Sequence, residues 1–135
     1  MNEQSALSMQ IDGSHYKKQK IQPIELAYLI GATPCFTKLA KYMTRDKGDR
    51  NINLDKAIHC VNIEKEIHET AMYHILDSYP LLTNPARLGQ AEMLINLFSE
   101  DPFVQAALKA MIRRDYDEAI AEVEALKRLL NVKHE

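Results

Sequence analysis

Glycine and cysteine are scarce in this chain of 135 residues, and their scarcity excludes several kinds of site. The four glycines are too scattered to form a phosphate-cradling loop, and no GxxxxGKS/T motif is present, so an ordinary P-loop kinase is excluded. The two cysteines, Cys35 and Cys60, belong to no CxxC pair, which suits neither a disulfide framework nor a zinc site. We therefore expect both cysteines to be small, buried, apolar side chains.

A basic excess and a long apolar run are also missing. The net charge is -2, so the chain has no surplus of cations to place along a nucleic-acid backbone, and we expect no DNA partner. Apolar stretches such as Met93–Leu97 fall far short of the about 20 residues that cross a bilayer. The N-terminus lacks the basic start and apolar stretch of a secretory signal. We expect a soluble, cytoplasmic protein without a membrane partner.

Prolines mark where most of the expected helices begin. Four prolines follow a polar residue and precede an apolar periodic stretch, at Gln22-Pro23, Thr33-Pro34, Asn84-Pro85 and Asp101-Pro102. Proline fits the first position of a helix because its missing N–H is not needed there. Asp115 and Glu118 form a capping-box pattern that starts a last helix. Asn53 is predicted to cap a long helix that continues to about Leu76.

The 46% hydrophobic content is enough for one compact unit, and no segment alternates apolar and polar residues like a strand. We predict an all-α fold of about six helices. Residues 1–13 are expected to be a flexible tail, and residues 14–78 an N-terminal helical region. Residues 79–135 would form a C-terminal helical subdomain or oligomerisation arm, with a hinge near Ser78–Thr83. Broad apolar stripes at Ile58–Ile63 and Leu126–Leu130 predict a homo-oligomer.

The helix expected after Thr33-Pro34 carries a stripe of cations. Lys38, Lys41 and Arg45 recur at helical spacing, opposite the apolar positions of the same segment. The preceding residues His15, Tyr16, Lys17 and Lys18 could fold over this stripe, with Lys47 and Lys56 on its flanks, and so form an anion site. Tyr16 or Tyr42 could stack on a base. A solvated helix face, a helix start at Gln22-Pro23 and a first-turn acid at Glu25 explain the same residues without a ligand.

Three segments in order, SHYKKQKIQPIE, FTKLAKYMTRDKG and NLDKA, resemble the SaV-like family of small tailed-phage proteins. The resemblance covers Ser14–Ile67, and it rests on the order and spacing of the segments. The positions that agree with the family's pattern are His15, Tyr16, Gln22, Pro23, Glu25, Lys41, Tyr42, Arg45, Lys47, Gly48, Leu54, Lys56 and Ala57. Two positions depart from it, because Thr37-Lys38 replaces a Gly-Asn step and Asn53 replaces an aspartate. The change at Asn53 is benign if the position is only an N-cap.

The family includes an early coliphage enzyme that phosphorylates nucleoside monophosphates without a recognised kinase motif. The resemblance therefore implies a phage or prophage nucleotide-binding protein in the bacterial host cytoplasm, acting as a nucleoside-monophosphate kinase. It implies that Lys41, Arg45 and His15 are catalytic: Lys41, Arg45 and Lys56 would hold the phosphates, and His15 and Tyr16 would close the site. The nucleotide-binding residues it implies are Tyr16, Lys17, Gln22, Glu25, Lys38, Tyr42, Lys47 and Lys56. ATP would bring Mg²⁺ with it, since no carboxylates show the spacing of a tightly bound metal site.

Two other functions compete with this one, and the sequence favours only the first of them. The first is a non-catalytic phage accessory protein that sequesters a nucleotide or binds a host protein through its C-terminal helices. The second is an all-α nucleoside triphosphate pyrophosphatase, for which Glu66 and Glu69 offer one acidic pair on a helix. The next helix supplies only Glu92, so the metal cluster of such an enzyme lacks its second pair. We expect Glu66 and Glu69 to be exposed acids, and the histidines His59, His68 and His74 to be packing or surface residues.

Overall fold

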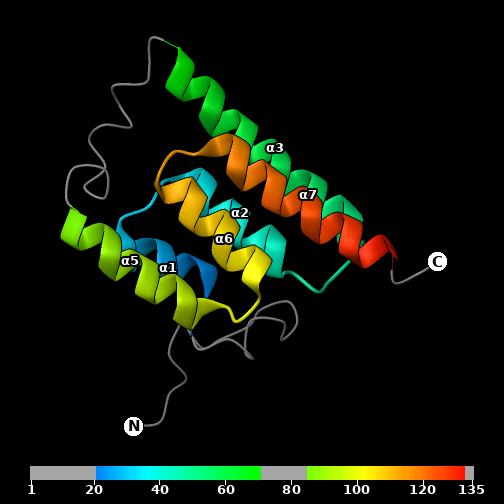
Figure 1. Ribbon diagram of the computed structural model, residues 1–135, viewed down its shortest axis with the longest axis horizontal. Helices are drawn as coiled ribbons and strands as arrows, with labels where there is room; N and C mark the ends of the chain where they lie inside the picture. Colours follow the sequence, from blue (N-terminus) through cyan, green and yellow to red (C-terminus); the bar gives the residue numbers. More distant parts are fainter. Residues whose placement is uncertain (1–20, 71–84, 133–135) are drawn as a thin grey trace, which may run out of the picture.

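The computed structural model describes residues 21–70 and 85–132, and every regular element in these two ranges is an α-helix (Figure 1). The helices are α1 (Pro23–Ile30), α2 (Pro34–Thr44), α3 (Arg50–Glu69), α5 (Pro85–Phe98), α6 (Pro102–Ile112) and α7 (Tyr116–Val132). The all-α prediction is therefore confirmed.

The helix starts predicted from proline are confirmed at all four positions. At the start of α2, the Thr33 hydroxyl oxygen accepts a hydrogen bond from the Phe36 amide at 3.2 Å. At the start of α6, the Asp101 carboxylate accepts one from the Phe103 amide at 2.8 Å. Gly31 ends α1 with a φ of 67°, a left-handed conformation that glycine adopts without steric penalty.

The start of α3 differs from the prediction. Asp49 is the N-cap, and its carboxylate accepts a hydrogen bond from the Ile52 amide at 3.2 Å. Asn53 lies in the first turn instead, 5% exposed, and its side-chain amide donates to the Lys47 carbonyl at 2.9 Å. The prediction that Asn53 caps this helix is wrong because Asp49, one turn earlier, takes that position. α3 ends at Glu69, and the part predicted up to Leu76 lies outside the described residues.

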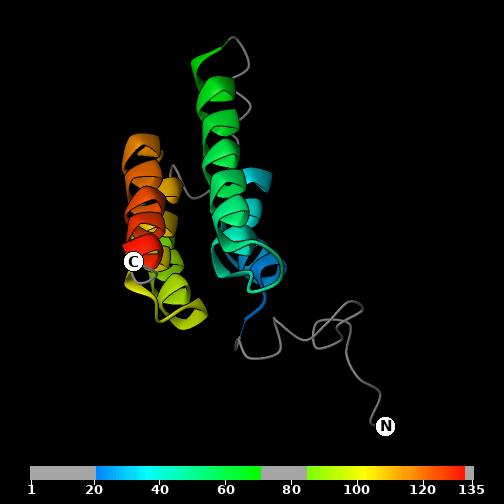
Figure 2. The same cartoon turned by 90° about the vertical axis from the view of Figure 1, so that its right-hand side faces the viewer.

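The helices form two layers of three (Figure 2). One layer contains α1, α2 and α3, the other contains α5, α6 and α7, and each helix packs on its counterpart, α1 on α5, α2 on α6 and α3 on α7. The core between the layers is continuous, and fully buried side chains such as Leu39 of α2 and Leu108 of α6 belong to the same cluster. The predicted hinge near Ser78–Thr83 lies outside the described residues.

α3 and α7 lie side by side and antiparallel (Figure 1). Polar side chains connect the two helices along their length. The bridges join Asn51 to Asn131 at 3.1 Å, Asp55 to Lys127 at 2.6 Å and Lys65 to Asp117 at 2.9 Å. Because residues early in α3 meet residues late in α7, the three bridges together fix the register of the pair.

The apolar stripes that predict a homo-oligomer are largely used inside the molecule. Cys60 and Val61 are buried on α3, and Leu126 is buried on α7, whereas Ile63 and Leu129 are 37% and 40% exposed. The homo-oligomer stays a prediction.

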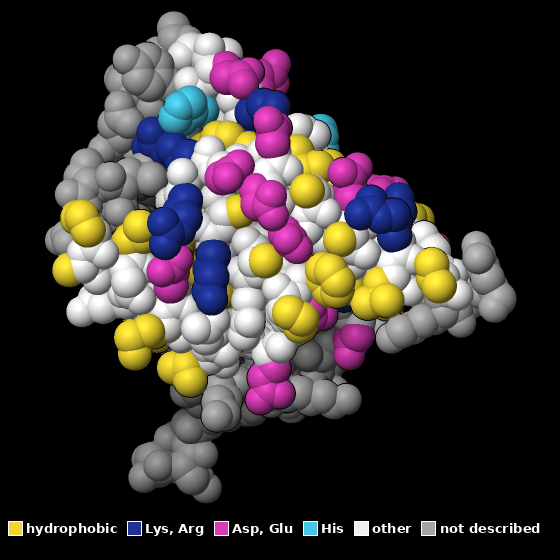
Figure 3. Space-filling view, in the orientation of Figure 1, with side chains coloured by type: hydrophobic (Ala, Val, Ile, Leu, Met, Phe, Trp, Pro, Cys, Tyr) yellow, Lys and Arg dark blue, Asp and Glu magenta, His cyan; other side chains and the backbone are white. Residues whose placement is uncertain are grey.

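The outer face of the α5–α7 layer has a mixed character (Figure 3). Acidic side chains gather over the start of α7, and apolar side chains gather over α5 and the far end of α7. On α5, Met93 and Leu97 are 68% and 55% exposed. Within residues 21–70 and 85–132, no helix is both long enough and apolar enough to span a bilayer.

Candidate functional site

α2 presents its predicted cations away from the core. Lys38 and Lys41 are exposed, while Tyr42 and Arg45 are half-buried at the border of the stripe. The opposite side of the helix is buried, with Phe36 at 1% exposure. The amphipathic spacing of this segment thus places the cationic stripe on the surface, as predicted.

Packing of α3 against α2 adds a further cation to this stripe. The Lys56 ammonium lies 5.8 Å from the centroid of the Tyr42 ring, within the range of a cation–π interaction. Lys38 lies close enough to α3 to act on Cys60: burial raises the pKa of that thiol, and the Lys38 charge lowers it. We call Lys38, Lys41, Arg45 and Lys56, together with Tyr42, the α2–α3 cationic face.

The carboxylates nearest to this face along the chain have other partners. Asp55 pairs with Lys127 of α7, and Asp49 caps α3. Asp46 acts on Arg50: burial lowers the pKa of that guanidinium, whereas the charges of Asp101 and Asp46 raise it. Among the described residues these three carboxylates act on other groups, and a surface that gathers several cations in this way favours an anionic ligand.

Other predicted site residues have structural roles or lie outside the described residues. His15, Tyr16 and Lys17 belong to the second group, so their predicted roles stay predictions. At the start of α1, the Glu25 carboxylate accepts a hydrogen bond from the Gln22 amide at 3.5 Å, as in a capping box. The Lys47 carbonyl accepts the side-chain amide of Asn53.

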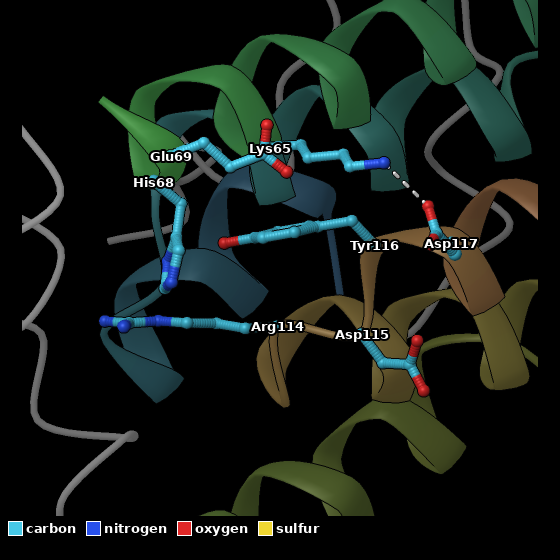
Figure 4. Close-up of a pocket in the computed structure, with 7 residues that line it drawn as sticks. All are labelled: Lys65, His68, Glu69, Arg114, Asp115, Tyr116 and Asp117. Carbon is cyan, nitrogen blue, oxygen red and sulfur yellow. Dashed lines mark hydrogen bonds and ion pairs between the residues drawn. The ribbon is translucent and has the colours of Figure 1, made fainter.

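A pocket that the sequence did not predict lies between the end of α3 and the turn from α6 to α7 (Figure 4). Its volume is about 250 Å³. All of its lining residues have ionisable side chains: Lys65, His68, Glu69, Arg114, Asp115, Tyr116 and Asp117.

A buried carboxyl group lies beside this pocket. Glu64 of α3 is 4% exposed, and the Thr33 hydroxyl donates a hydrogen bond to its Oε1 atom. Burial raises the pKa of Glu64, while hydrogen bonding from Thr33 and Tyr116 and the charges of Arg114 and His68 lower it. Glu64 is thus a titratable group that connects α2, α3 and the start of α7.

Tyr116 lines the pocket and interacts with Glu64. The residue is 6% exposed, and its ring meets the His68 ring edge-on, with centroids 5.9 Å apart and an interplanar angle of 67°. Burial, followed by the charge of Glu64, raises the pKa of the Tyr116 phenol. The phenol therefore stays protonated near neutral pH and can donate a hydrogen bond.

Arg114 has an unusual backbone conformation. Its φ is 60°, and within residues 21–70 and 85–132 every other residue with a positive φ is a glycine. Its amide donates to the Met111 carbonyl at 3.1 Å, and the Asp115 amide donates to the Ala110 carbonyl at 2.9 Å. These two bonds form a Schellman motif, whose left-handed position is usually glycine. An arginine there costs about 1–2 kcal/mol relative to an unstrained backbone.

One sequence signal could have pointed to this pocket. Ala57, Val61, Glu64 and His68 follow one another along α3 at helical spacing, so an acid and a histidine continue an apolar stripe. Ionisable residues in such positions are buried or nearly so, and buried ionisable groups are frequent at functional sites. His68 is half-buried against Tyr116, which agrees with its interpretation as a packing residue.

The cysteines and the acidic pair offer little chemistry. Cys60 is buried, but Cys35 is only half-buried, so the prediction of burial holds for one of the two. Burial, and then the charge of Glu64, raises the pKa of Cys35 to about 11, which makes it a poor nucleophile near neutral pH. Glu66 and Glu69 are exposed, as predicted.

Neither a metal cluster nor a relative supplies an identity for this site. Glu92, the acid that a pyrophosphatase site would need, pairs with Arg113. Among the residues that the structure describes, no group of three or more His, Cys, Asp or Glu side chains could hold a metal ion.

No protein-family model, no curated protein and no solved structure matches this chain. The resemblance to the SaV-like family therefore stays a prediction.

Proposed function

We propose that the protein binds a nucleotide through the α2–α3 cationic face. The observation that carries this proposal is the position of the Lys56 ammonium over the Tyr42 ring, which joins a cation of α3 to the cationic stripe of α2. Lys41 and Lys38 are exposed on the same stripe, so their ammonium groups are accessible to phosphate oxygens. Several cations on one surface are what a polyphosphate requires, because its charge must be neutralised at several oxygens.

Tyr42 has a definite role in this proposal. Its ring holds the Lys56 side chain in place, which lowers the entropy that the lysine would otherwise lose on binding a phosphate. The two helices are anchored to each other and to the core, so the face is rigid. Gln22 and Glu25, to which the resemblance gives a contact with sugar or base, would have to make that contact from the capped start of α1.

The reaction that the resemblance implies is transfer of a phosphoryl group from ATP to a nucleoside monophosphate. Lys41, Arg45 and Lys56 would stabilise the charge on the transferred group, and Mg²⁺ would arrive with ATP. The alternative is a protein that binds the nucleotide without turnover and so sequesters it.

Calorimetric titration with ATP and with each deoxynucleoside monophosphate tests the binding. We expect Lys56→Ala and Lys41→Ala each to weaken the affinity by about tenfold, since each removes one charge-assisted contact. Arg128→Ala is the matched control, because it removes an exposed cation from α7 in the other layer. Equal affinities in all three variants would contradict the proposed face.

A coupled assay of ADP formation in the same samples separates the two alternatives. Turnover that disappears in Lys41→Ala and Arg45→Ala supports the kinase, and binding without turnover supports sequestration. If no nucleotide binds, the proposal is wrong, and the exposed apolar side chains of α5 become the feature to test for a host-protein partner.

A further inference from the structure

Exposed apolar side chains are concentrated on α1 and α5. These two helices pack on each other at one edge of the two layers, and the α3–α7 pair forms the other edge (Figure 1). Five of the nine large apolar side chains that are exposed in the described residues belong to α1 and α5, and each of the five is more than half exposed. We call these five residues the α1–α5 apolar edge: Ile24, Tyr28, Leu29, Met93 and Leu97.

The exposed surface of α1 and α5 is also free of charge. Among the residues described in these two helices, every exposed one is uncharged, whereas α2, α3 and α7 each expose charged side chains. The charged residues of α1 and α5 are Glu25, Arg87 and Glu92, all half-buried, and Glu92 pairs with Arg113. The chain as a whole is 27% charged, so this composition is a local depletion. Depletion of charge is typical of the centre of a protein–protein interface.

A second copy of the chain is the partner that this composition favours. In a twofold contact the same surface faces itself, so a net charge on it would repel the same charge on the other copy. An uncharged surface avoids that repulsion, and it offers no charge by which a different partner could be selected. Tyr28, which is 83% exposed, is of the residue type that most often anchors such a contact.

The area of the α1–α5 apolar edge is sufficient for a weak dimer. A fully exposed large side chain presents on the order of 200 Å². The exposed fractions of the five side chains then give about 600 Å² per protomer, so two such edges would bury about 1,200 Å² in total. This is the lower limit of a stable interface, so we expect a Kd on the order of 10 µM. Below that concentration the chain is a monomer, in which these residues are ordinary surface positions.

We propose that two copies of the protein associate through the α1–α5 apolar edge, related by a twofold axis. The surface differs from the apolar stripes of α3 and α7 that predicted an oligomer from the sequence, because those stripes are largely buried inside the molecule. The α3–α7 edge is bridged instead by charged pairs, Asp55 with Lys127 and Lys65 with Asp117. The proposal does not depend on nucleotide binding at the α2–α3 cationic face.

Sedimentation equilibrium of the full-length chain, from about 2 µM to about 500 µM, tests the association. We expect the mass to rise with concentration from 15.5 kDa towards twice that value. A mass of 15.5 kDa over the whole range would overturn the proposal, and the edge would then be open to another segment of the chain or to a different protein.

Charged substitutions test the surface. Tyr28→Glu and Met93→Glu each place a like charge on both copies, so we expect each to weaken self-association at least tenfold. Both side chains are more than two-thirds exposed, so the variants should keep the circular dichroism spectrum of the wild type. Gln90→Glu adds the charge at an exposed position of α5 with almost no change of shape, and we expect about threefold weaker association.

Ile52→Glu is the matched control, because Ile52 is an apolar residue of α3 that is 53% exposed and lies outside the α1–α5 apolar edge. Its association should stay within twofold of the wild type. Equal weakening in Ile52→Glu and Tyr28→Glu would overturn the assignment of the surface.

Amide spectra of the ¹⁵N-labelled protein across the same concentrations locate the contact. We expect concentration-dependent shifts in residues 24–29 and 86–97. Shifts confined to α3 and α7 would show that the copies associate through another surface and would contradict the proposal.

Discussion

At the scale of single residues, Glu64 makes the stability of the protein depend on pH. Its pKa in the folded state is raised, chiefly by burial, so the folded chain holds this proton more tightly than the unfolded chain does. The contribution of Glu64 is therefore full below the unfolded pKa of about 4.3, and it is lost as pH rises through the folded pKa.

Glu64→Gln tests this dependence, because glutamine stays neutral and keeps an oxygen for the Thr33 hydroxyl. We expect the variant to be more stable than the wild type at about pH 8 and the difference to vanish near about pH 4, by about 1.4 kcal/mol for each unit of the pKa difference. Urea denaturation across this pH range measures it. A difference that does not change with pH would contradict the prediction.

Asn53 is a second residue whose environment decides its role. The pattern of the SaV-like family has an aspartate at this position. In this chain the Asn53 side chain donates a hydrogen bond to the Lys47 carbonyl, which an ionised carboxylate cannot do. We expect Asn53→Asp to destabilise the protein by about 2 kcal/mol or more, since it buries a charge against a carbonyl oxygen.

Chemical denaturation at neutral pH measures this loss. Asn62→Asp is the control, because Asn62 lies on the exposed side of the same helix. If both variants lose the same stability, Asn53 has no special role and its substitution is as benign as an N-cap exchange.

At the scale of elements, the prolines made most helix starts predictable. Proline fixes its own φ and needs no donor, so the start at Pro34 or Pro102 depends on nearby residues alone. The start of α3 was not predictable in this way. Asp49 and Asn53 are both good caps by type, and the choice depends on the burial of Asn53 against the loop, which is a tertiary effect.

Two glycines are expected to respond in opposite ways to substitution by alanine. Gly89 lies inside α5, where an added methyl group would meet open space, so Gly89→Ala should stabilise the protein by about 0.5–1 kcal/mol. Gly48 also has open space, but its φ is 81°, so Gly48→Ala should destabilise it by about 1 kcal/mol. Thermal denaturation followed by circular dichroism measures both, and shifts of the same sign would contradict the argument.

At the scale of the whole molecule, the shared core links the stability of the two layers. Leu108 is fully buried at the interface of α6 with the rest of the core. We expect Leu108→Ala to cost about 2–5 kcal/mol and to reduce amide protection from hydrogen exchange in α2 and α3 as well as in α6 and α7.

Leu97→Ala is the matched control, because Leu97 is 55% exposed on α5. Its effect should be within about 0.5 kcal/mol, as for most surface positions. A loss of protection limited to α5–α7 in Leu108→Ala would show that the layers unfold separately.

The two candidate sites differ in how far the sequence could reveal them. Most of the α2–α3 cationic face lies on one helix, so the helical spacing was enough to predict that Lys38 and Lys41 are exposed together, with Arg45 at the border of the same stripe. The pocket joins residues from α3 with Arg114 and Tyr116, far along the chain, and only tertiary packing brings them together. Local patterns carry no information about such a contact.

The division of the core between the layers also has a consequence for chain integrity. Neither half of the polypeptide can cover its own apolar face, since each layer needs the other to exclude water from it. A single proteolytic cut between Thr70 and Pro85 would therefore leave two fragments that remain bound as a noncovalent complex. Releasing one fragment from the other would expose the same shared core that denaturation of the intact chain exposes.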